Sequence, residues 1–288
     1  MILLDGSFGT CLWGKAEEKG IEKTPVWMYN KTQPEMVEAL CMEYFNAGTQ
    51  IIQTNTFSAN PETLERFGWD LKENIKDAVE IARSARKSFL ENNPAKAGTD
   101  GIKISLDIGP LPRFLDPIGN MTEKEAGDAF TQIIDAGISA GVDLIFLETF
   151  QDLNLMKIGA DVAMKSLKPT FTSFSYDERC RTLCGDTPEE IARTMAELGV
   201  DVLGINCSFG PVAALPVLDQ YKSALNDLGS DIKLLFKPNV DENMTPEEFA
   251  NDCKPAFDKA SYIGSCCGSS PKFIKALKNL DSDCFSRQ

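Results

Sequence analysis

The chain has 288 residues, and 43% of them are hydrophobic, which is enough to bury a substantial core. The formal net charge of −14 disfavours nucleic acids and anionic membranes as partners, because their surfaces would repel such a protein. No apolar run approaches the roughly 20 residues that cross a bilayer, and the first residues lack the basic region of a signal peptide. We therefore expect a cytoplasmic protein.

The predicted elements alternate between short apolar strands and longer amphipathic helices. In chain order, the predicted strands cover residues 2–4, 50–57, 102–108, 142–150, 170–176, 202–207, 233–238 and 262–266. Helices are predicted at 34–47, 71–90, 122–140, 152–167 and 211–228, from the caps Thr187 and Thr245 onwards, and at 271–280. Two long loops, at 10–33 and 109–122, have the length that usually covers a functional face.

Eight strands, each followed by a helical segment, predict a parallel sheet joined by crossover helices. Eight such units in a chain of this length favour a closed α/β barrel, the (β/α)8 TIM barrel, as one domain over residues 1–288. An open doubly wound sheet is the alternative. No glycine-rich phosphate-binding pattern follows the first strand, which disfavours a dinucleotide-binding fold.

The sequence contains nine cysteines and no histidine. So many cysteines without an export signal favour a reducing compartment over a disulfide framework. The absence of histidine excludes every nucleophile that relies on an imidazole base, and it removes the commonest nitrogen ligand for metals. A soft metal in this chain would therefore have to be held by cysteine thiolates.

Three cysteines lie at the ends of predicted strands six and eight, namely Cys207, Cys266 and Cys267. Inward-pointing side chains of alternate barrel strands share a layer, so these sulfurs can meet above the barrel. Neighbours on a strand face opposite sides, and Gly264 and Gly268 would permit the bend that turns both Cys266 and Cys267 inwards. The adjacent pair alone is also compatible with buried structural thiols or a vicinal disulfide. The third cysteine favours zinc.

A zinc ion with three cysteine ligands keeps one coordination position open. Three thiolates leave the complex with a net negative charge, which makes the metal weak at polarising carbonyl groups. The same site suits a fourth thiol, because the metal lowers the pKa of that thiol while its sulfur stays nucleophilic. The predicted chemistry is alkyl transfer to sulfur rather than hydrolysis.

Two carboxylates, Asp5 and Glu148, end the first and fourth predicted strands. They could clamp the ammonium group of an amino acid, or they could be an ordinary loop acid and a helix cap. The turn Gly6–Gly9 after Asp5 could offer backbone N–H groups to a carboxylate. Together, these groups would recognise an amino acid that bears a thiol.

Seven short motifs extend this pattern over nearly the whole chain. They are Leu4–Thr10, Gln53–Phe57, Asp107–Pro110, Glu148–Phe150, Gly204–Ser208, Pro238–Asn239 and Gly264–Gly268. In this order they resemble the homocysteine S-methyltransferase family, and above all the homocysteine-binding domain of cobalamin-dependent methionine synthase. The likeness runs from Ile2 to Leu280, and the Asn-Cys and Gly-Ser-Cys-Cys-Gly motifs are its most specific part.

The resemblance implies a zinc-dependent methyltransferase that transfers a methyl group to the thiolate of homocysteine and so makes methionine. It implies that Cys207, Cys266 and Cys267 hold the zinc ion and form the catalytic centre. It further implies that Asn239 is an oxygen ligand while the thiol position is empty.

For the substrate, the resemblance implies that Asp5 and Glu148 hold the ammonium group of homocysteine. It implies that the backbone amides at Ser7 and Phe8 meet the substrate carboxylate. Neither a nucleic acid nor a membrane is implied as a partner.

The chain departs from the family pattern at Lys237, where a smaller or acidic residue is common, and at Val240-Asp241, where a glycine is usual. These changes leave the zinc cysteines intact and bear on the methyl donor and the acceptor thiol. No folate-binding or cobalamin-binding segment follows the barrel, so we expect the donor to be a free small molecule or a separate corrinoid protein that carries cobalamin.

Two alternatives remain. One is a methyltransferase component that moves methyl groups between another methylated substrate and a corrinoid protein. The other is a non-catalytic barrel that binds zinc or thiols, although such a protein needs no amino-acid clamp.

Overall fold

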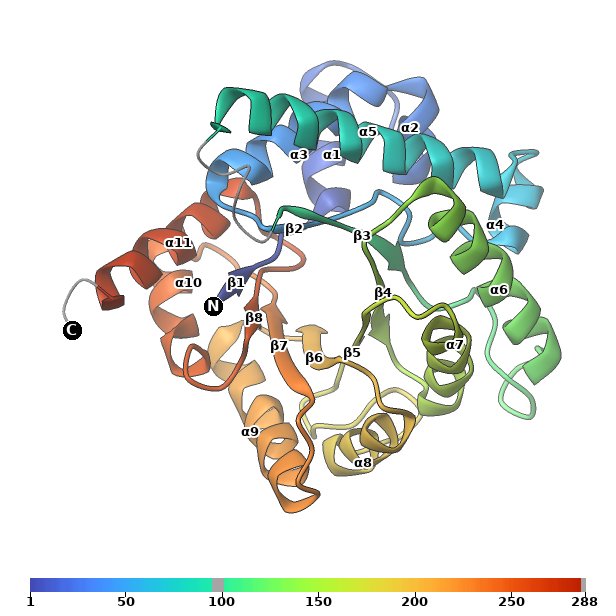
Figure 1. Cartoon of the computed structure of the whole chain (residues 1–288), viewed down its shortest axis with the longest axis vertical. Coiled ribbons are helices and arrows are strands. Elements are labelled where there is room, and N and C mark those ends of the chain that lie inside the picture. Colours follow the sequence, from blue (N-terminus) through green and yellow to red (C-terminus); the bar gives the residue numbers. More distant parts are fainter. Residues whose placement is uncertain (95–100, 286–288) are drawn as a thin grey trace.

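The computed structural model describes residues 1–94 and 101–285, with side chains described as far as residue 280. Within these ranges, eight parallel strands form one sheet (Figure 1). They are β1 (Ile2–Leu3), β2 (Ile51–Gln53), β3 (Lys103–Ile108), β4 (Leu144–Phe150), β5 (Thr170–Phe174), β6 (Val202–Cys207), β7 (Lys233–Pro238) and β8 (Tyr262–Ile263).

The sheet closes on itself. Strand β1 pairs with β8, and on its other side a parallel bridge joins Leu4 to Ile51 of β2. The backbone N–H of Gln50 also donates to the carbonyl oxygen of Leu3 at 2.7 Å. The remaining strands follow one another in chain order around the ring. The prediction of a (β/α)8 TIM barrel is therefore confirmed.

Helices surround the ring of strands, as Figure 1 shows. The α-helices in the described part of the chain are α1 (Phe8–Glu18), α2 (Tyr29–Thr32), α3 (Pro34–Ala47), α4 (Pro61–Arg66), α5 (Leu71–Asn92), α6 (Glu123–Ala140), α7 (Leu153–Lys165), α8 (Pro188–Leu198), α9 (Pro211–Asp227), α10 (Pro246–Cys253) and α11 (Pro271–Phe285). The same part of the chain contains the 3-10 helices η1 (Val26–Met28) and η3 (Lys254–Ala256). Capping boxes at Thr122, Thr187 and Thr245 start α6, α8 and α10, because each threonine and the glutamate three residues later satisfy each other's backbone N–H groups.

The segment 10–33 is not the long loop that its sequence suggests. It contains most of α1, together with η1 and α2, and the Ser7 hydroxyl caps α1 by accepting from the Thr10 N–H at 3.2 Å. Leu12 of α1 and Trp27 of η1 are buried, so packing against the barrel, rather than a strong amphipathic pattern, stabilises these elements. By contrast, the segment 109–122 is a loop, as predicted.

The interior of the barrel has two layers. The layer nearer the N-terminal ends of the strands is an apolar cluster of Leu4, Ile51, Leu144, Phe146, Phe171, Val202 and Leu235. Because side chains alternate along a strand, residues two or four places further on also face inwards, and those are polar. They are Gln53, Glu148, Asn206 and Lys237, joined by Asp107, which is in register with Phe146 on the next strand.

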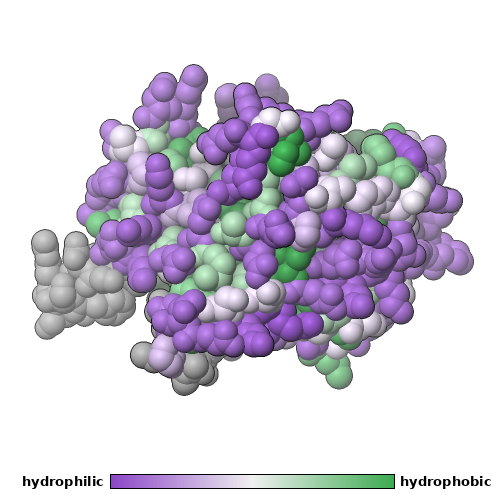
Figure 2. Space-filling model, turned by 90° about the horizontal axis from the view of Figure 1, so that it is seen from above, coloured by the Kyte–Doolittle hydropathy of each residue, from purple (hydrophilic) through white to green (hydrophobic). Residues whose placement is uncertain are grey.

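The surface matches the acidic composition. The face in Figure 2 is mostly hydrophilic, and its apolar side chains are scattered among polar ones. None of the helices in the described ranges has the length and apolar character needed to span a membrane.

A second, larger apolar core lies between the barrel and its helices.

Candidate metal centre and substrate site

The structure brings the three cysteines of strands six and eight together. The Sγ atoms of Cys207, Cys266 and Cys267 all lie within 4.8 Å of one another, and those of Cys207 and Cys267 are 3.7 Å apart. Cys207 ends β6, and the other two lie in the turn just after β8. The cluster therefore lies at the C-terminal ends of the strands, where TIM barrels carry their active sites.

Unusual backbone conformations aim these sulfurs at one point. Cys207 and Ser208 adopt φ angles of 55° and 63°, in the left-handed region that non-glycine residues rarely enter. Gly268 has a φ of 78°, which glycine adopts without strain. Hydrogen bonds hold the second turn in place, because the Cys266 N–H donates to the Pro238 carbonyl oxygen at 2.8 Å. The bend that the sequence required at the Cys-Cys pair is thus present.

The donor set fits a soft metal such as zinc. Hydrogen bonds from the Cys266 and Cys267 thiols lower the pKa of Cys207. Donating to Cys207 in turn raises the pKa of Cys266 and that of Cys267. The cluster thus stabilises one thiolate by itself and would need a cation to hold three. Asn239 hydrogen-bonds to Cys207, and its Oδ1 atom is buried without a hydrogen-bond partner in the described structure. This free amide oxygen beside the cysteine cluster is suited to the predicted role of Asn239 as an oxygen ligand of the metal.

Asn206 links the sulfur cluster to strand β4. Its side-chain amide N–H groups reach the Thr149 hydroxyl at 2.6 Å and the Cys266 Sγ at 3.7 Å. Its oxygen accepts from the Thr149 N–H at 3.1 Å and from the Ser173 hydroxyl at 2.8 Å. Thr149 has a φ of 62° and lies where the β4–β5 register shifts. This contact fixes the strand end that carries Glu148, a positioning role that the sequence did not assign to Asn206.

Lys237 lies between the two acids that were predicted to hold the substrate ammonium group. Its Nζ atom is 2.9 Å from Glu148 Oε1 and 3.3 Å from Asp5 Oδ1, and it also donates to the Gln53 side-chain oxygen. Gln53 completes the network, because its backbone N–H donates to Asp5 Oδ2 at 2.6 Å and its amide donates to Glu148 Oε2 at 3.0 Å. The sequence marked Lys237 only as a departure from the family pattern. In the structure it is 1% exposed and is the centre of the polar layer.

Burial and ion pairing act in opposite directions on these groups. Burial alone would lower the pKa of Lys237, but Glu148 and Asp5 raise it overall, so the lysine stays charged. Burial raises the pKa of Asp5 to about 6, although Lys237 and the Gln53 N–H lower it. Burial also raises the pKa of Glu148 and, together with the Glu148 charge, that of Asp107. Asp107 is therefore a third carboxyl group of the same cluster, for which sequence analysis proposed no role.

The turn after Asp5 is already partly engaged. The Ser7 N–H donates to the Ser269 hydroxyl at 3.1 Å, and the Ser7 carbonyl oxygen accepts from the Tyr44 hydroxyl at 3.0 Å. Phe8 is the first residue of α1, and the first N–H groups of a helix have no intrahelical partner. Of the two predicted carboxylate-binding amides, the one at Phe8 is thus better placed to meet an anion at the helix N-terminus.

Val240 and Asp241, where the chain also departs from the family pattern, follow β7 close to the turn that carries Cys267. The Val240 N–H donates to the Cys267 carbonyl oxygen at 3.0 Å. A Cβ atom built on Gly210 would lie 1.9 Å from a carboxylate oxygen of Asp241, so that side chain covers the start of α9. Val240 thus supports the turn that carries Cys267, whereas Asp241 lies against the N-terminus of α9.

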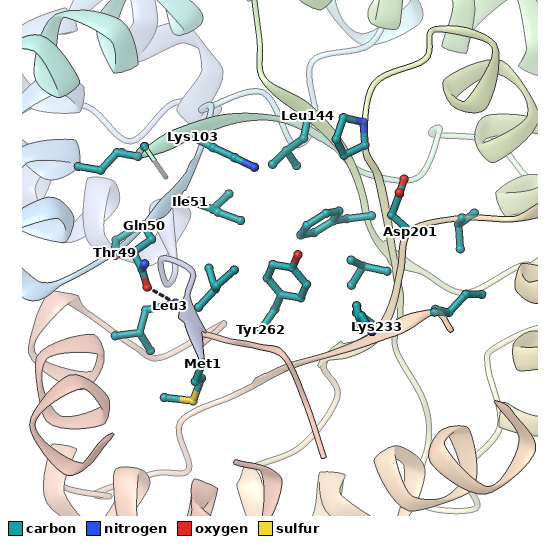
Figure 3. A pocket seen from close by; sticks show the side chains of 18 of the residues that line it. Met1, Leu3, Thr49, Gln50, Ile51, Lys103, Leu144, Asp201, Lys233 and Tyr262 are labelled. Atoms are coloured by element: carbon teal, nitrogen blue, oxygen red, sulfur yellow. Dashed lines mark hydrogen bonds between the residues drawn. The ribbon is translucent and has the colours of Figure 1, made fainter. Parts of the chain in front are cut away.

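A hollow lies at the opposite end of the barrel. It has a volume of about 1310 Å³ and is lined at the N-terminal ends of the strands by residues such as Lys103, Asp201 and Tyr262. Figure 3 shows Ile51, Leu144 and Tyr262 converging on its floor. None of the predicted site residues lines it.

The sequence model of the family described as "Homocysteine S-methyltransferase" matches residues 2–280. The chain belongs to the homocysteine S-methyltransferase family. The expected resemblance is confirmed.

Relatives in this family differ in length and in the reactions that their names describe. The methionine synthase of Mycobacterium leprae is 26% identical over 278 residues, which cover 88% of this chain and 22% of that protein. Betaine–homocysteine S-methyltransferase 1 of Danio rerio is 24% identical and covers 96% of this chain and 72% of its own length. The chain thus spans about a fifth of the methionine synthases that it matches.

Solved structures of the homocysteine methyltransferase MmuM from Escherichia coli share the fold. The oxidized form superimposes with a TM-score of 0.77 at 24% identity, over 97% of this chain and 96% of that one. The metallated form gives 0.75 at 23% identity with the same coverage.

Proposed function

We propose that this protein is a zinc-dependent methyltransferase that transfers a methyl group to the thiolate of homocysteine, giving methionine. The observation that carries the proposal is the group of three sulfurs within 4.8 Å of one another at the C-terminal ends of the strands. Family membership supports the acceptor. The carboxylate cluster beside the sulfurs supports an acceptor with an ammonium group, because buried negative charge favours a cation.

Each residue of the site has a separate task in this reaction. Cys207, Cys266 and Cys267 would hold the ion, and Asn239 would occupy the position that the acceptor thiol takes over. When bound, zinc would lower the pKa of the acceptor thiol and keep the resulting thiolate nucleophilic. The acceptor loses its thiol proton to solvent, its sulfur forms a bond to the methyl carbon, and the bond between that carbon and the donor breaks.

The same proposal includes the compartment and the donor. The metal-binding thiols must stay reduced, which favours the cytoplasm. The donor is S-methylmethionine, S-adenosylmethionine, a betaine or the methylcobalamin of a separate corrinoid protein. A corrinoid partner stays within the proposal because the methionine synthases extend far beyond the region that this chain matches.

A donor screen tests the proposal directly. The full chain, loaded with zinc, is incubated with homocysteine and each donor, and methionine is measured by mass spectrometry. We expect close to one zinc per chain and methionine from at least one donor. Cys207→Ser should lose the zinc and the product, whereas Cys184→Ser, a thiol in the loop after β5, should keep both. Purified protein that binds no zinc and has freely titrating thiols would refute the mechanism.

A further inference from the structure

The position that a substrate ammonium would take between Asp5 and Glu148 is filled by the chain itself. Lys237 places its ammonium group there, within ion-pair distance of both acids. Asp5 is completely buried, and both of its carboxylate oxygens accept hydrogen bonds, one from Lys237 and one from the Gln53 N–H. A second ammonium group can reach Asp5 only if Lys237 leaves a buried site where it donates to Asp5 and Gln53 and forms an ion pair with Glu148.

In the described part of the chain, the cluster nevertheless includes buried carboxylate oxygens that accept no hydrogen bond. Among the described residues, two buried carboxylate oxygens lack a hydrogen-bond partner, Asp107 Oδ1 and Glu148 Oε1. The Glu148 oxygen is 2.9 Å from the Lys237 Nζ atom, so it has an ion pair without hydrogen-bond geometry. Asp107 Oδ1 has neither, although the Gln53 side chain hydrogen-bonds to the Asp107 carboxyl group. Buried polar atoms of folded proteins are rarely left in this state unless a ligand or solvent meets them.

These two carboxyl groups face the same space. Asp107 is in register with Phe146, and Glu148 is two residues further along the neighbouring strand β4. Both side chains point into the barrel, and they retain 7% and 6% exposure, whereas Asp5 has none. The charge of Glu148 is the largest electrostatic influence on Asp107 after burial. The pair lies beside the sulfur cluster, because the Asn206 amide contacts both the hydroxyl of Thr149, the residue after Glu148, at 2.6 Å and the Cys266 Sγ at 3.7 Å.

We propose that Asp107 and Glu148, rather than Asp5 and Glu148, bind the α-ammonium group of the acceptor thiol, while Lys237 is a resident counter-ion that occupies the Asp5 side. The inference rests on the proposed function and assigns its substrate-ammonium subsite. It makes Asp107 a specificity-determining residue and Lys237 a positioning residue.

The charges of the cluster are consistent with this arrangement. Three carboxyl groups share one lysine, and burial raises the pKa of each of them, so a further cation would favour their ionised forms. A substrate ammonium would supply that cation, donate to Asp107 Oδ1 and share Glu148 Oε1 with Lys237. An acceptor without an amino group would leave them as they are. The site should therefore distinguish a thiol amino acid from the same thiol without its amine.

Calorimetric titration of the zinc-loaded full chain tests the assignment. The ligands are homocysteine and 4-mercaptobutanoate, which is homocysteine without its amino group. Wild type should bind homocysteine at least about tenfold more tightly. Asp107→Asn should weaken homocysteine binding about tenfold to a hundredfold and change 4-mercaptobutanoate binding less than about threefold. The matched control Asp161→Asn, on the exposed face of α7, should change neither.

The outcomes separate the two proposals. Equal affinity of wild type for both thiols overturns the inference, because Lys237 would then have replaced the substrate ammonium altogether; this measurement needs no variant. A loss confined to homocysteine in Asp5→Asn, with Asp107→Asn unchanged, also overturns it and restores the Asp5 clamp. Homocysteine binding that survives Asp107→Asn in a variant with normal zinc content and melting overturns only the inference. Failure of zinc-loaded wild type to bind either thiol overturns the proposed function and the inference with it.

Discussion

The two ends of the barrel interior are built from the same strands and have opposite characters. At the N-terminal end, inward side chains such as Leu144, Phe171 and Leu235 form an apolar plug, with an open hollow beyond it. At the C-terminal end, the next inward positions carry buried carboxyl groups, a lysine and amides. A shift of two residues along one strand, from Leu235 to Lys237, is enough to pass from one layer to the other. The apolar layer stabilises the fold, whereas the polar layer buries charged groups at some cost in stability.

Metal removal should show the largest effect and should be confined to the C-terminal end. Treatment with a strong chelator should lower methyl transfer at least about a thousandfold, because the acceptor thiol would no longer be bound and deprotonated by the metal. Far-UV circular dichroism should stay unchanged, since the apolar layer does not depend on the ion. Zinc should restore activity. Unfolding on chelation would mean that the two ends are not independent.

Loss of the central lysine should destabilise the polar layer. Lys237→Met leaves the buried carboxylates without their counter-ion and should lower the free energy of unfolding at pH 7 by about 3–5 kcal/mol. Urea denaturation measures this change. The matched control Lys259→Met breaks only a partly exposed pair with Asp219 and should cost less than about 1 kcal/mol. Similar values for both variants would argue against a buried ionic centre.

A cavity in the apolar layer should have the reverse signature. Leu235→Ala should lower the free energy of unfolding by about 2–4 kcal/mol, because Leu235 is completely buried inside the barrel. Zinc content and homocysteine affinity should stay at wild-type values. Leu183→Ala, at an exposed loop position, serves as the control for thermal melting. A large loss of zinc in Leu235→Ala would couple the two layers.

The pH dependence of stability should reveal the strain at Asp5. Its pKa is about 6 in the fold and 3.8 for the free side chain, so the folded state binds this proton more tightly. The resulting stability is fully present below pH 3.8 and is lost as the pH rises through about 6. Between these limits, a difference of about two pKa units corresponds to roughly 3 kcal/mol or less. Urea titrations of wild type and Asp5→Asn at several pH values isolate this effect, since the variant should lack it.

Much of the fold could be read from the sequence. Strands β6 and β7 have the predicted bounds, and the helix starts at Thr187 and Thr245 are the predicted caps, because both signals are local. Helix α1 was missed. Gly9 and Gly14 weaken its intrinsic propensity, and burial of Leu12 against the barrel, a tertiary effect, stabilises it.

The cysteine cluster could be predicted from the sequence, whereas the polar layer around Lys237 could not. The convergence of Cys207 with Cys266 and Cys267 could be expected, because strand ends meet at one rim of a barrel. The location of Lys237 could not, since its neighbours on β7 are apolar and its partners come from three other parts of the chain. The sequence marked Asp107 only as a polar residue at a strand end. That its Oδ1 atom is buried without a hydrogen-bond partner can be seen only in the structure.

The spacing of the sulfurs has a mechanical consequence. Cys207 and Cys267 are 60 residues apart in the chain, so an ion shared between them would tie β6 to β8 and close a loop that contains α9, β7 and α10. Closing a loop restricts the unfolded chain and protects the native one from partial opening. The last third of the barrel would then resist local unfolding only while loaded, and amide hydrogen exchange in β7 and α10 would report metal occupancy without any substrate.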